Sequence, residues 1–181
     1  MSNNHKTPAM KVGIIGVGNI SPAYIKGCRM FDNLELVACA DIDLDRAKSV
    51  AAENNIPHAF SVEEILAQPD IDILINLTIP KAHSAVSLRV IEAGKHVYSE
   101  KPLATTFEDG QAIMAAAAAK GVRVGCAPDT FMFGPHQAAR HILIRALSAR
   151  RWRRWASWLV TVPKSGILIP NSSTSRVAVR C

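Results

Sequence analysis

Short, nearly continuous apolar runs alternate with segments whose apolar positions recur at helical spacing. Runs with so few polar positions are typical of strands buried on both faces, and the segments between them are long enough to be crossover helices. The predicted strands are 11–16, 34–41, 71–80, 95–102 and 122–127. The predicted helices are 21–30, 43–55, 83–94 and 105–120, with a short one starting at Ser61 and a last one from about Pro135. This alternation predicts an α/β fold, a doubly wound parallel sheet of the Rossmann-like class.

Polar residues ahead of the helical segments predict where the helices begin. Ser21 followed by Pro22 is a typical N-cap and first-turn pair. Ser61 and Glu64 have the spacing of a capping box, in which each side chain bonds the backbone N–H of the other residue. Thr105 is the expected cap of the alanine-rich helix. These signals place each expected helix directly after an expected strand or turn.

Two glycines follow the first strand, in the stretch KVGIIGVGNISPAY (residues 11–24). Gly16 would let the chain turn tightly, and Gly18 would let backbone approach a pyrophosphate with no Cβ in the way. The helix that follows offers unpaired N–H groups and a positive dipole end to phosphates. Ser21 stands where a full G-x-G-x-x-G fingerprint has its third glycine. Since glycine-rich turns after strands are common, the turn alone is weak evidence of dinucleotide binding.

Asp41 ends the second predicted strand, 25 residues after Gly16. A carboxylate at that place can accept hydrogen bonds from both adenosine ribose hydroxyls. Helix capping is the alternative role, for which Asp43 is better placed. The 2′-phosphate of NADP would meet a like charge here, at a cost of about 4 kcal/mol for unit charges about 4 Å apart at an effective dielectric of about 20. The residues therefore predict NAD rather than NADP, although Arg46, one turn further on, could soften the discrimination.

The stretches NLTIPKAH (76–83) and AGKHVYSEKPLA (93–104) carry a resemblance to a known family. Together with GVGNIS and ACAD, they resemble the glucose–fructose oxidoreductase/inositol dehydrogenase family (Gfo/Idh/MocA) over residues 11 to about 144. The Glu-Lys-Pro turn is the most specific part. The resemblance implies an NAD(P)-dependent oxidoreductase acting by hydride transfer on sugars, cyclitols and related polyols.

The resemblance also implies a role for residues along the cofactor. These are Gly16, Gly18, Asn19 and Ile20 at the pyrophosphate turn, Asp41 at the adenosine ribose, Thr78, Pro80 and His83 near the nicotinamide half, and Glu100 against that half. A histidine at a helix start is as often structural, so both roles stay open for His83. No spacing of the histidines and cysteines predicts a metal site.

Lys101 would be the catalytic residue, standing beside the reacting carbon of the substrate. Oxidation of an alcohol removes a hydride and a proton, and a cationic amine near the hydroxyl stabilises negative charge on oxygen and can pass the proton on. The resemblance further implies an unusual, cis, peptide bond before Pro102 that fixes the direction of Lys101.

Charge divides the chain into parts of different composition. Residues 1–144 hold 13 basic and 15 acidic side chains, whereas residues 145–181 hold 8 basic and no acidic ones. All three tryptophans lie between residues 152 and 158. The segment 145–181 reads as an irregular basic tail. Translation in a shifted frame would explain its abrupt composition; a nucleic-acid or membrane patch and a packing stripe are the alternatives.

The expected organisation is a disordered lead-in (1–10), a dinucleotide-binding domain (11–144) and the tail (145–181). Family members continue into a large sheet domain that supplies most of the substrate pocket, and the 37 residues after Ile144 do not resemble it. Three functions follow as alternatives: an oxidoreductase completed by another chain, a cofactor-binding remnant without turnover, or a binder acting through the tail. Scattered cysteines, with neither a secretion signal nor a membrane-length apolar run, favour the cytoplasm. The expected partner is a nicotinamide dinucleotide, with no nucleic acid and no membrane.

Overall fold

The computed structural model describes residues 8–128 and 130–146, so the interpretations of the lead-in before residue 8 and of the tail after residue 146 lie outside the described residues. The chain divides into two units, Met1–Pro128 and Asp129–Cys181, which we describe separately. The sequence analysis extended the dinucleotide-binding domain to residue 144, beyond this division.

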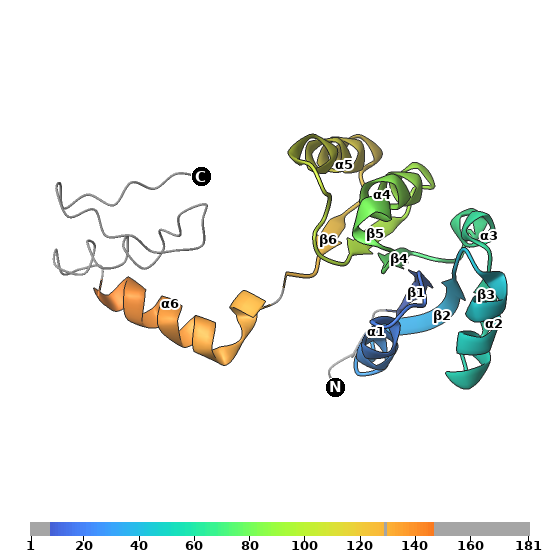
Figure 1. The fold of residues 1–181 in the computed structure, drawn as a ribbon, viewed down its shortest axis with the longest axis horizontal. Helices are drawn as coiled ribbons and strands as arrows, with labels where there is room; N and C mark the ends of the chain where they lie inside the picture. Colours follow the sequence, from blue (N-terminus) through green and yellow to red (C-terminus); the bar gives the residue numbers. More distant parts are fainter. Residues whose placement is uncertain (1–7, 129, 147–181) are drawn as a thin grey trace, which may run out of the picture. The chain divides into compact units, whose positions relative to one another are not determined.

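The first unit is built on a six-stranded parallel sheet with the order β3-β2-β1-β4-β5-β6 (Figure 1). The strands are β1 (Met10–Ile15), β2 (Leu34–Ala40), β3 (His58–Phe60), β4 (Ile73–Asn76), β5 (His96–Ser99) and β6 (Val124–Cys126). The helices that follow them are α1 (Ser21–Cys28), α2 (Leu44–Glu53), α3 (Val62–Ala67), α4 (His83–Glu92) and α5 (Phe107–Lys120), with a 3₁₀ turn η1 (Pro80–Ala82) before α4. The predicted doubly wound α/β class is confirmed, and the order of strands reverses at β1.

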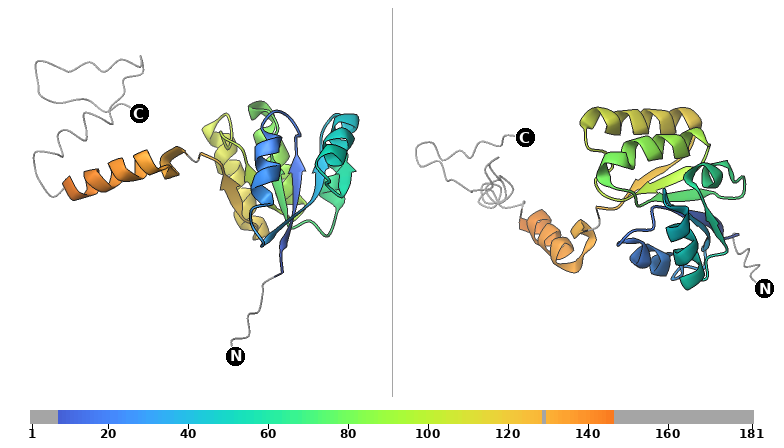
Figure 2. Two further views of the ribbon diagram at one scale, coloured as in Figure 1. Left: turned by 90° about the horizontal axis from the view of Figure 1, so that it is seen from below. Right: turned by 45° about the vertical axis from the view of Figure 1, so that its right-hand side comes forward.

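Helices lie on both sides of the sheet, as Figure 2 shows. One apolar cluster joins Ile14 of β1 to Ile25 of α1 and Ala51 of α2. The other joins Ile15, the next residue of β1, to Ile91 of α4, and α3 and α5 also contribute to it. Successive side chains of a strand point to opposite faces, so adjacent residues of β1 serve the two clusters. This burial on both faces explains why the strands read as continuous apolar runs.

Two of the expected helix caps were misplaced. Ile20 is the N-cap of α1, and Ser21 is its first residue, with Oγ donating to the Gly18 carbonyl at 2.8 Å. Thr106, not Thr105, caps α5, because its Oγ1 accepts the Asp109 N–H at 3.1 Å. The capping box of α3 is present as expected from its sequence.

One strand and the ends of two others also differ from the prediction. Strand β3, a three-residue strand at the edge of the sheet, was not predicted from the sequence. The apolar run 71–80 continues past the end of β4 at Asn76, because residues 77–79 form a loop and Pro80 begins η1. The run 95–102 likewise outlasts β5, which ends at Ser99. In both cases the extra residues belong to loops at the same edge of the sheet.

In the second unit, the described residues form a 3₁₀ turn η2 (Thr130–Met132) and helix α6 (Gly134–Ala146). This helix begins one residue before Pro135, where the sequence predicted a last helix. Within the described ranges, no helix is both long and apolar enough to cross a membrane.

Candidate cofactor site

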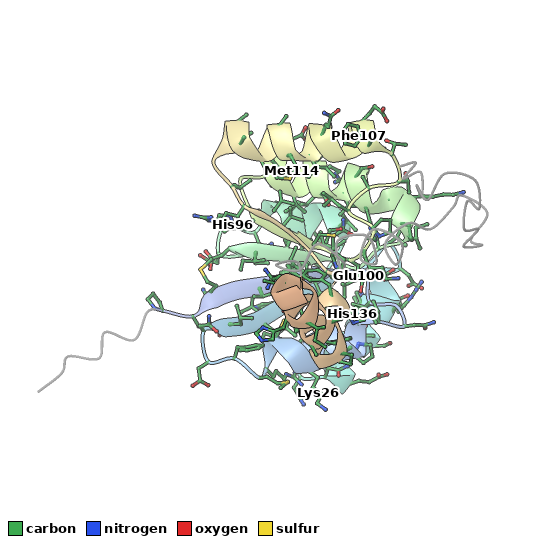
Figure 3. All side chains as sticks on the ribbon, turned by 90° about the vertical axis from the view of Figure 1, so that its left-hand side faces the viewer. Lys26, His96, Glu100, Phe107, Met114 and His136 are labelled. Carbon is green, nitrogen blue, oxygen red and sulfur yellow. The ribbon has the colours of Figure 1, made fainter. Side chains whose placement is uncertain are left out.

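The candidate site lies at the carboxyl edge of the sheet. Ile15, the last residue of β1, pairs with Ala40 of β2 and with Asn76 of β4, and Asn76 pairs in turn with Ser99 of β5. The loops after these four strands therefore start at one level, and every site residue expected from the sequence lies in or just after one of them. Figure 3 shows Glu100 just beyond the end of β5 that belongs to this edge and His96 at the opposite end of the strand. Ligands of doubly wound sheets bind at this edge, where the strand order reverses.

Gly16 makes the tight turn after β1. Its φ is +93°, a conformation that side chains disfavour, and a Cβ there would lie 2.8 Å from the carbonyl carbon of Leu77 and 2.9 Å from the backbone nitrogen of Thr78. Those neighbours are backbone atoms of the loop after β4 and cannot swing aside. Only glycine lets the two loops approach this closely.

Gly18 differs, because a Cβ built on it meets nothing within 4 Å. The space beside this residue is open, as the interpretation as a pyrophosphate turn requires. Asn19 is exposed, and Ile20 is 44% exposed. The turn leads directly into α1, whose N-terminus carries the positive end of the helix dipole.

Asp41 is buried at the end of β2 and is bound to the glycine turn. The Val17 N–H donates to Oδ2 at 2.9 Å, and the Asp43 N–H donates to Oδ1 at 3.1 Å. The Arg46 guanidinium lies 3.8 Å from Oδ1. A carboxylate has about four lone-pair positions, so two remain for a ligand. The side chain thus fixes the turn and can still accept further hydrogen bonds.

Asp43 takes the capping role that was the alternative for Asp41. It is the N-cap of α2, and its Oδ1 accepts the Arg46 N–H at 3.2 Å. That hydrogen bond, together with the Arg46 guanidinium, holds the pKa of Asp43 below its ordinary value. The capping alternative therefore does not explain the position of Asp41.

The loop after β4 is organised by Asn76. Its side-chain oxygen accepts the Thr78 hydroxyl at 2.7 Å and the Thr78 N–H at 3.2 Å. Its Nδ2 donates to the His83 carbonyl at 3.0 Å and to Ser87 Oγ at 3.1 Å. Pro80, which is exposed, begins η1. The buried amide therefore holds the expected cofactor residue Thr78 against the start of α4.

His83 is 1% exposed, and both of its ring nitrogens face carbonyl oxygens of the protein. Nδ1 lies 2.5 Å from the Pro102 oxygen, and Nε2 lies 2.9 Å from the Thr78 oxygen. Neither nitrogen is left for a ligand in this arrangement. Of the two roles open for His83, the geometry favours the structural one over direct cofactor contact.

The Glu-Lys-Pro turn follows β5. Oε1 of Glu100 accepts the Tyr24 hydroxyl at 3.1 Å, and Oε2 accepts the Lys101 N–H at 2.6 Å. Lys101 is exposed, and the bond between it and Pro102 is cis, as expected. Tyr24, a residue of α1, was missed by the sequence analysis. Tyr24 and Glu100 are 76 positions apart in the sequence, so their contact could not be predicted from spacing, and an aromatic residue inside a helix usually belongs to the core.

Cysteine and metal chemistry add little to this site. Cys28, Cys39 and Cys126 are free thiols. Among the residues that the structure describes, no three His, Cys, Asp or Glu side chains are grouped so that they could hold a metal ion.

A reversing parallel sheet, a glycine turn leading into a helix and a buried carboxylate at the end of β2 define an NAD(P)-binding Rossmann domain. The oxidoreductase family with an NAD-binding Rossmann fold, Gfo/Idh/MocA, matches residues 10–127, and the chain belongs to this family. The family membership predicted from the resemblance is thus confirmed.

Individual relatives agree with this assignment. An inositol 2-dehydrogenase of Saccharopolyspora erythraea is 38% identical over 116 residues, which are 64% of this chain and 34% of that protein. The WlbA dehydrogenase of Bordetella pertussis, solved with NADH and UDP-GlcNAcA, superposes with a TM-score of 0.73 at 28% identity, over 77% of this chain and 42% of that one. The biliverdin reductase of Synechocystis, solved with biliverdin and NADP+, gives 0.67 at 28% identity, over 74% and 42%. The chain thus spans well under half the length of these proteins.

Proposed function

We propose that this chain binds NAD at the carboxyl edge of its sheet and supplies the cofactor half of an enzyme that transfers a hydride between NAD and an alcohol carbon of a sugar or polyol. The observation that carries the proposal is the buried Asp41 carboxylate, which is bonded to the glycine turn and keeps acceptor positions open. The names of the relatives, an inositol dehydrogenase and a dehydrogenase solved with a sugar nucleotide, support the substrate class.

The residues fit a dinucleotide from one end to the other. The open space beside Gly18 and the exposed residues Asn19 and Ile20 would receive the pyrophosphate at the N-terminus of α1. Asp41 would accept the hydroxyls of the adenosine ribose, on the β2 side. The nicotinamide half would then lie over the loops after β4 and β5, near Thr78, Pro80 and Glu100.

Bound NAD supplies the hydride acceptor, and the part of this chain in the chemistry falls to Lys101. The ammonium group of this exposed side chain would lie beside the substrate hydroxyl. There it would stabilise negative charge on the oxygen and pass the proton on. Glu100 would contact the nicotinamide half and, by holding the Lys101 N–H, fix the backbone from which Lys101 projects.

The choice of NAD over NADP follows from charge. A 2′-phosphate at Asp41 would meet a buried carboxylate, whereas the ribose hydroxyls of NAD can donate to it. Arg46 could compensate, but its guanidinium already lies within 4 Å of two carboxylates, Asp41 and Asp43. Structural neighbours hold either nucleotide, so the preference rests on these side chains.

Titration calorimetry of the 181-residue chain tests this function. We expect NAD to bind at least about tenfold more tightly than NADP, a difference of about 1.4 kcal/mol or more. Asp41→Ala should weaken NAD binding by at most a few kcal/mol, since one hydrogen bond to a charged group contributes about 1.5–3 kcal/mol, and should narrow the gap to NADP. Equal affinities in the unaltered chain would contradict the cofactor choice, and no binding of either nucleotide would contradict the function.

The cytoplasm remains our proposed location, on the grounds of free cysteines. The alternative of a binder acting through the basic tail concerns residues outside the described part of the chain.

A further inference from the structure

The turn that carries Lys101 is held by three segments that lie far from it in the sequence. The Glu100 N–H donates to the Asn76 carbonyl at 2.9 Å, which continues the ladder between β4 and β5 by one step. Tyr24 of α1 donates its hydroxyl to the Glu100 side chain, and the His83 ring faces the Pro102 carbonyl. The residues on both sides of the lysine are therefore fixed, while the lysine itself is exposed.

His83 links two loops of the candidate site. Its ring lies between the Thr78 carbonyl, after β4, and the Pro102 carbonyl, after β5. A buried polar ring is costly unless it is hydrogen-bonded, and here each nitrogen faces a carbonyl oxygen, to one of which the single N–H of a neutral ring can donate. Asn76 in turn holds the backbone of His83 through the carbonyl of that residue. One buried side chain thus faces both loops, in addition to the bond between the Glu100 N–H and the Asn76 carbonyl.

Tyr24 links the same turn to a different part of the site. It lies in α1, the helix that follows the glycine turn, and its hydroxyl donates to the side chain of Glu100, 76 positions further along the chain. The Tyr24 ring also lies 6.4 Å from that of Tyr98 in β5. Through this residue, the helix that follows the expected pyrophosphate turn is bonded to the turn expected to face the nicotinamide half.

We propose that Tyr24 and His83 are positioning residues that set the orientation of Glu100 and Lys101 toward the nicotinamide half of the bound cofactor. This inference rests on the proposed NAD binding and adds two residues that act through the Glu100–Pro102 turn. It implies that their loss weakens contacts to the nicotinamide half and leaves contacts to the adenosine half intact.

The test compares NAD with ADP-ribose, which lacks the nicotinamide ring, by calorimetry on the full chain. Tyr24→Phe removes only the hydroxyl and keeps the ring beside Tyr98. We expect it to weaken NAD binding by about three- to tenfold, the range of one hydrogen bond, and to leave the ADP-ribose affinity within about twofold. His83→Ala should likewise weaken NAD binding and leave the ADP-ribose affinity unchanged. His83→Asn should restore part of the lost NAD affinity. His96→Ala is the control, because this histidine lies at the opposite end of β5 and its Nδ1 accepts the Arg123 N–H.

A double-mutant cycle separates positioning from stability. If Tyr24 acts through Glu100, Tyr24→Phe should have little further effect on NAD binding in a Glu100→Ala background, which lacks the oxygen that accepts the Tyr24 hydroxyl. The inference would be overturned by additive effects of the two substitutions on NAD affinity. It would also be overturned if Tyr24→Phe lowered the NAD and ADP-ribose affinities equally, or lowered neither. None of these results would contradict NAD binding itself. If the unaltered chain binds neither ligand, the proposed function fails and takes the inference with it. Should His83→Ala not fold, Tyr24→Phe and the cycle decide alone.

Discussion

At the scale of single residues, Gly16 and Gly18 lie two positions apart and are glycine for different reasons. Gly16→Ala would force a Cβ against the backbone of Leu77 and Thr78 at a φ of +93°, so we expect a loss of at least about 2 kcal/mol in the free energy of unfolding. Gly18→Ala places its Cβ in open space, so the melting temperature should hardly change. The same methyl group would lie where the pyrophosphate is expected, and NAD affinity should fall about tenfold or more.

Urea unfolding and calorimetry on the two glycine variants check this dissociation. A Gly18→Ala variant with unchanged NAD affinity would show that the turn does not contact the pyrophosphate. A Gly16→Ala variant of unchanged stability would contradict the backbone contact seen in the structure.

The Cys39 thiol makes stability depend on pH in the alkaline range. Burial, with a smaller contribution from the charge of Asp41, raises the pKa of Cys39 from 9.0 to about 11. Above pH 9 the thiol ionises in the unfolded chain but stays protonated in the folded one, so stability should fall as the pH rises from about 9 to 11. The slope from this group approaches about 1.4 kcal/mol per pH unit.

Unfolding by urea at a series of pH values, in the unaltered chain and in Cys39→Ala, isolates this group from tyrosines and lysines that titrate in both. The variant should lose stability less steeply over the window. Parallel slopes would mean that Cys39 is not protected from ionisation.

The sequence predicted the candidate site residues that belong to a short local motif. It did not predict contacts between residues that are far apart in the chain. Gly16 and Asp41 follow predicted strands with the spacing of a dinucleotide site, and Lys101 was indicated by the resemblance of the Glu-Lys-Pro turn to the family. The bond from the Val17 N–H to Asp41 and the contact between Tyr24 and Glu100 depend on which strands are neighbours in the sheet. Sequence spacing contains no such information, and His83 was ambiguous for the same reason.

At the scale of elements, the cap of α5 provides a matched pair of neighbouring threonines. Thr106 accepts the Asp109 N–H through its hydroxyl, while Thr105 is exposed and precedes the cap. Thr106→Ala should lower the free energy of unfolding by about 1 kcal/mol, because a helix N–H loses its acceptor. Thr105→Ala, the control, should change it by less than about 0.5 kcal/mol. Thermal unfolding of both variants decides, and a larger loss for Thr105→Ala would restore the assignment made from sequence.

Elements were easier to predict than their ends. Buried strands give strong apolar runs, yet apolar residues continue into the loops after β4 and β5, where Leu77 is buried although it lies beyond the strand. β3 was not predicted because a strand of three residues is too short to show an alternation of apolar and polar positions. The cap of α5 was displaced by one because two threonines precede that helix.

At the scale of the whole molecule, the order of strands explains why one edge holds every candidate residue. β1 lies between β2 and β4. The glycine turn after β1 therefore lies between Asp41, which follows β2, and the loops after β4 and β5, the second of which carries Lys101. The alternation of runs in the sequence predicted a doubly wound parallel sheet, but the order of its strands comes from the structure. The domain predicted to end at residue 144 includes α6, which the structure assigns to the second unit.

The 181-residue chain by itself should bind NAD but reduce it slowly or not at all with inositol, glucose and other polyols. The described residues provide the cofactor edge and an exposed Lys101, and the chain spans 34% of the length of an inositol dehydrogenase relative. Hydride transfer also needs the substrate carbon held close to the nicotinamide, and such positioning contributes about 7–11 kcal/mol to lowering the barrier. One lysine cannot supply that alone.

Fluorescence titration with NADH and an absorbance assay of nicotinamide reduction separate binding from turnover. We expect saturable binding and no reduction above background. Rates of about 1–10³ per second, abolished by Lys101→Ala, would contradict this expectation, because they would show that the chain positions a substrate without further protein. Saturable NADH binding without any reduction of NAD by the polyols would instead mean that the chain binds the dinucleotide. Positioning of the substrate would then have to come from protein beyond the described residues.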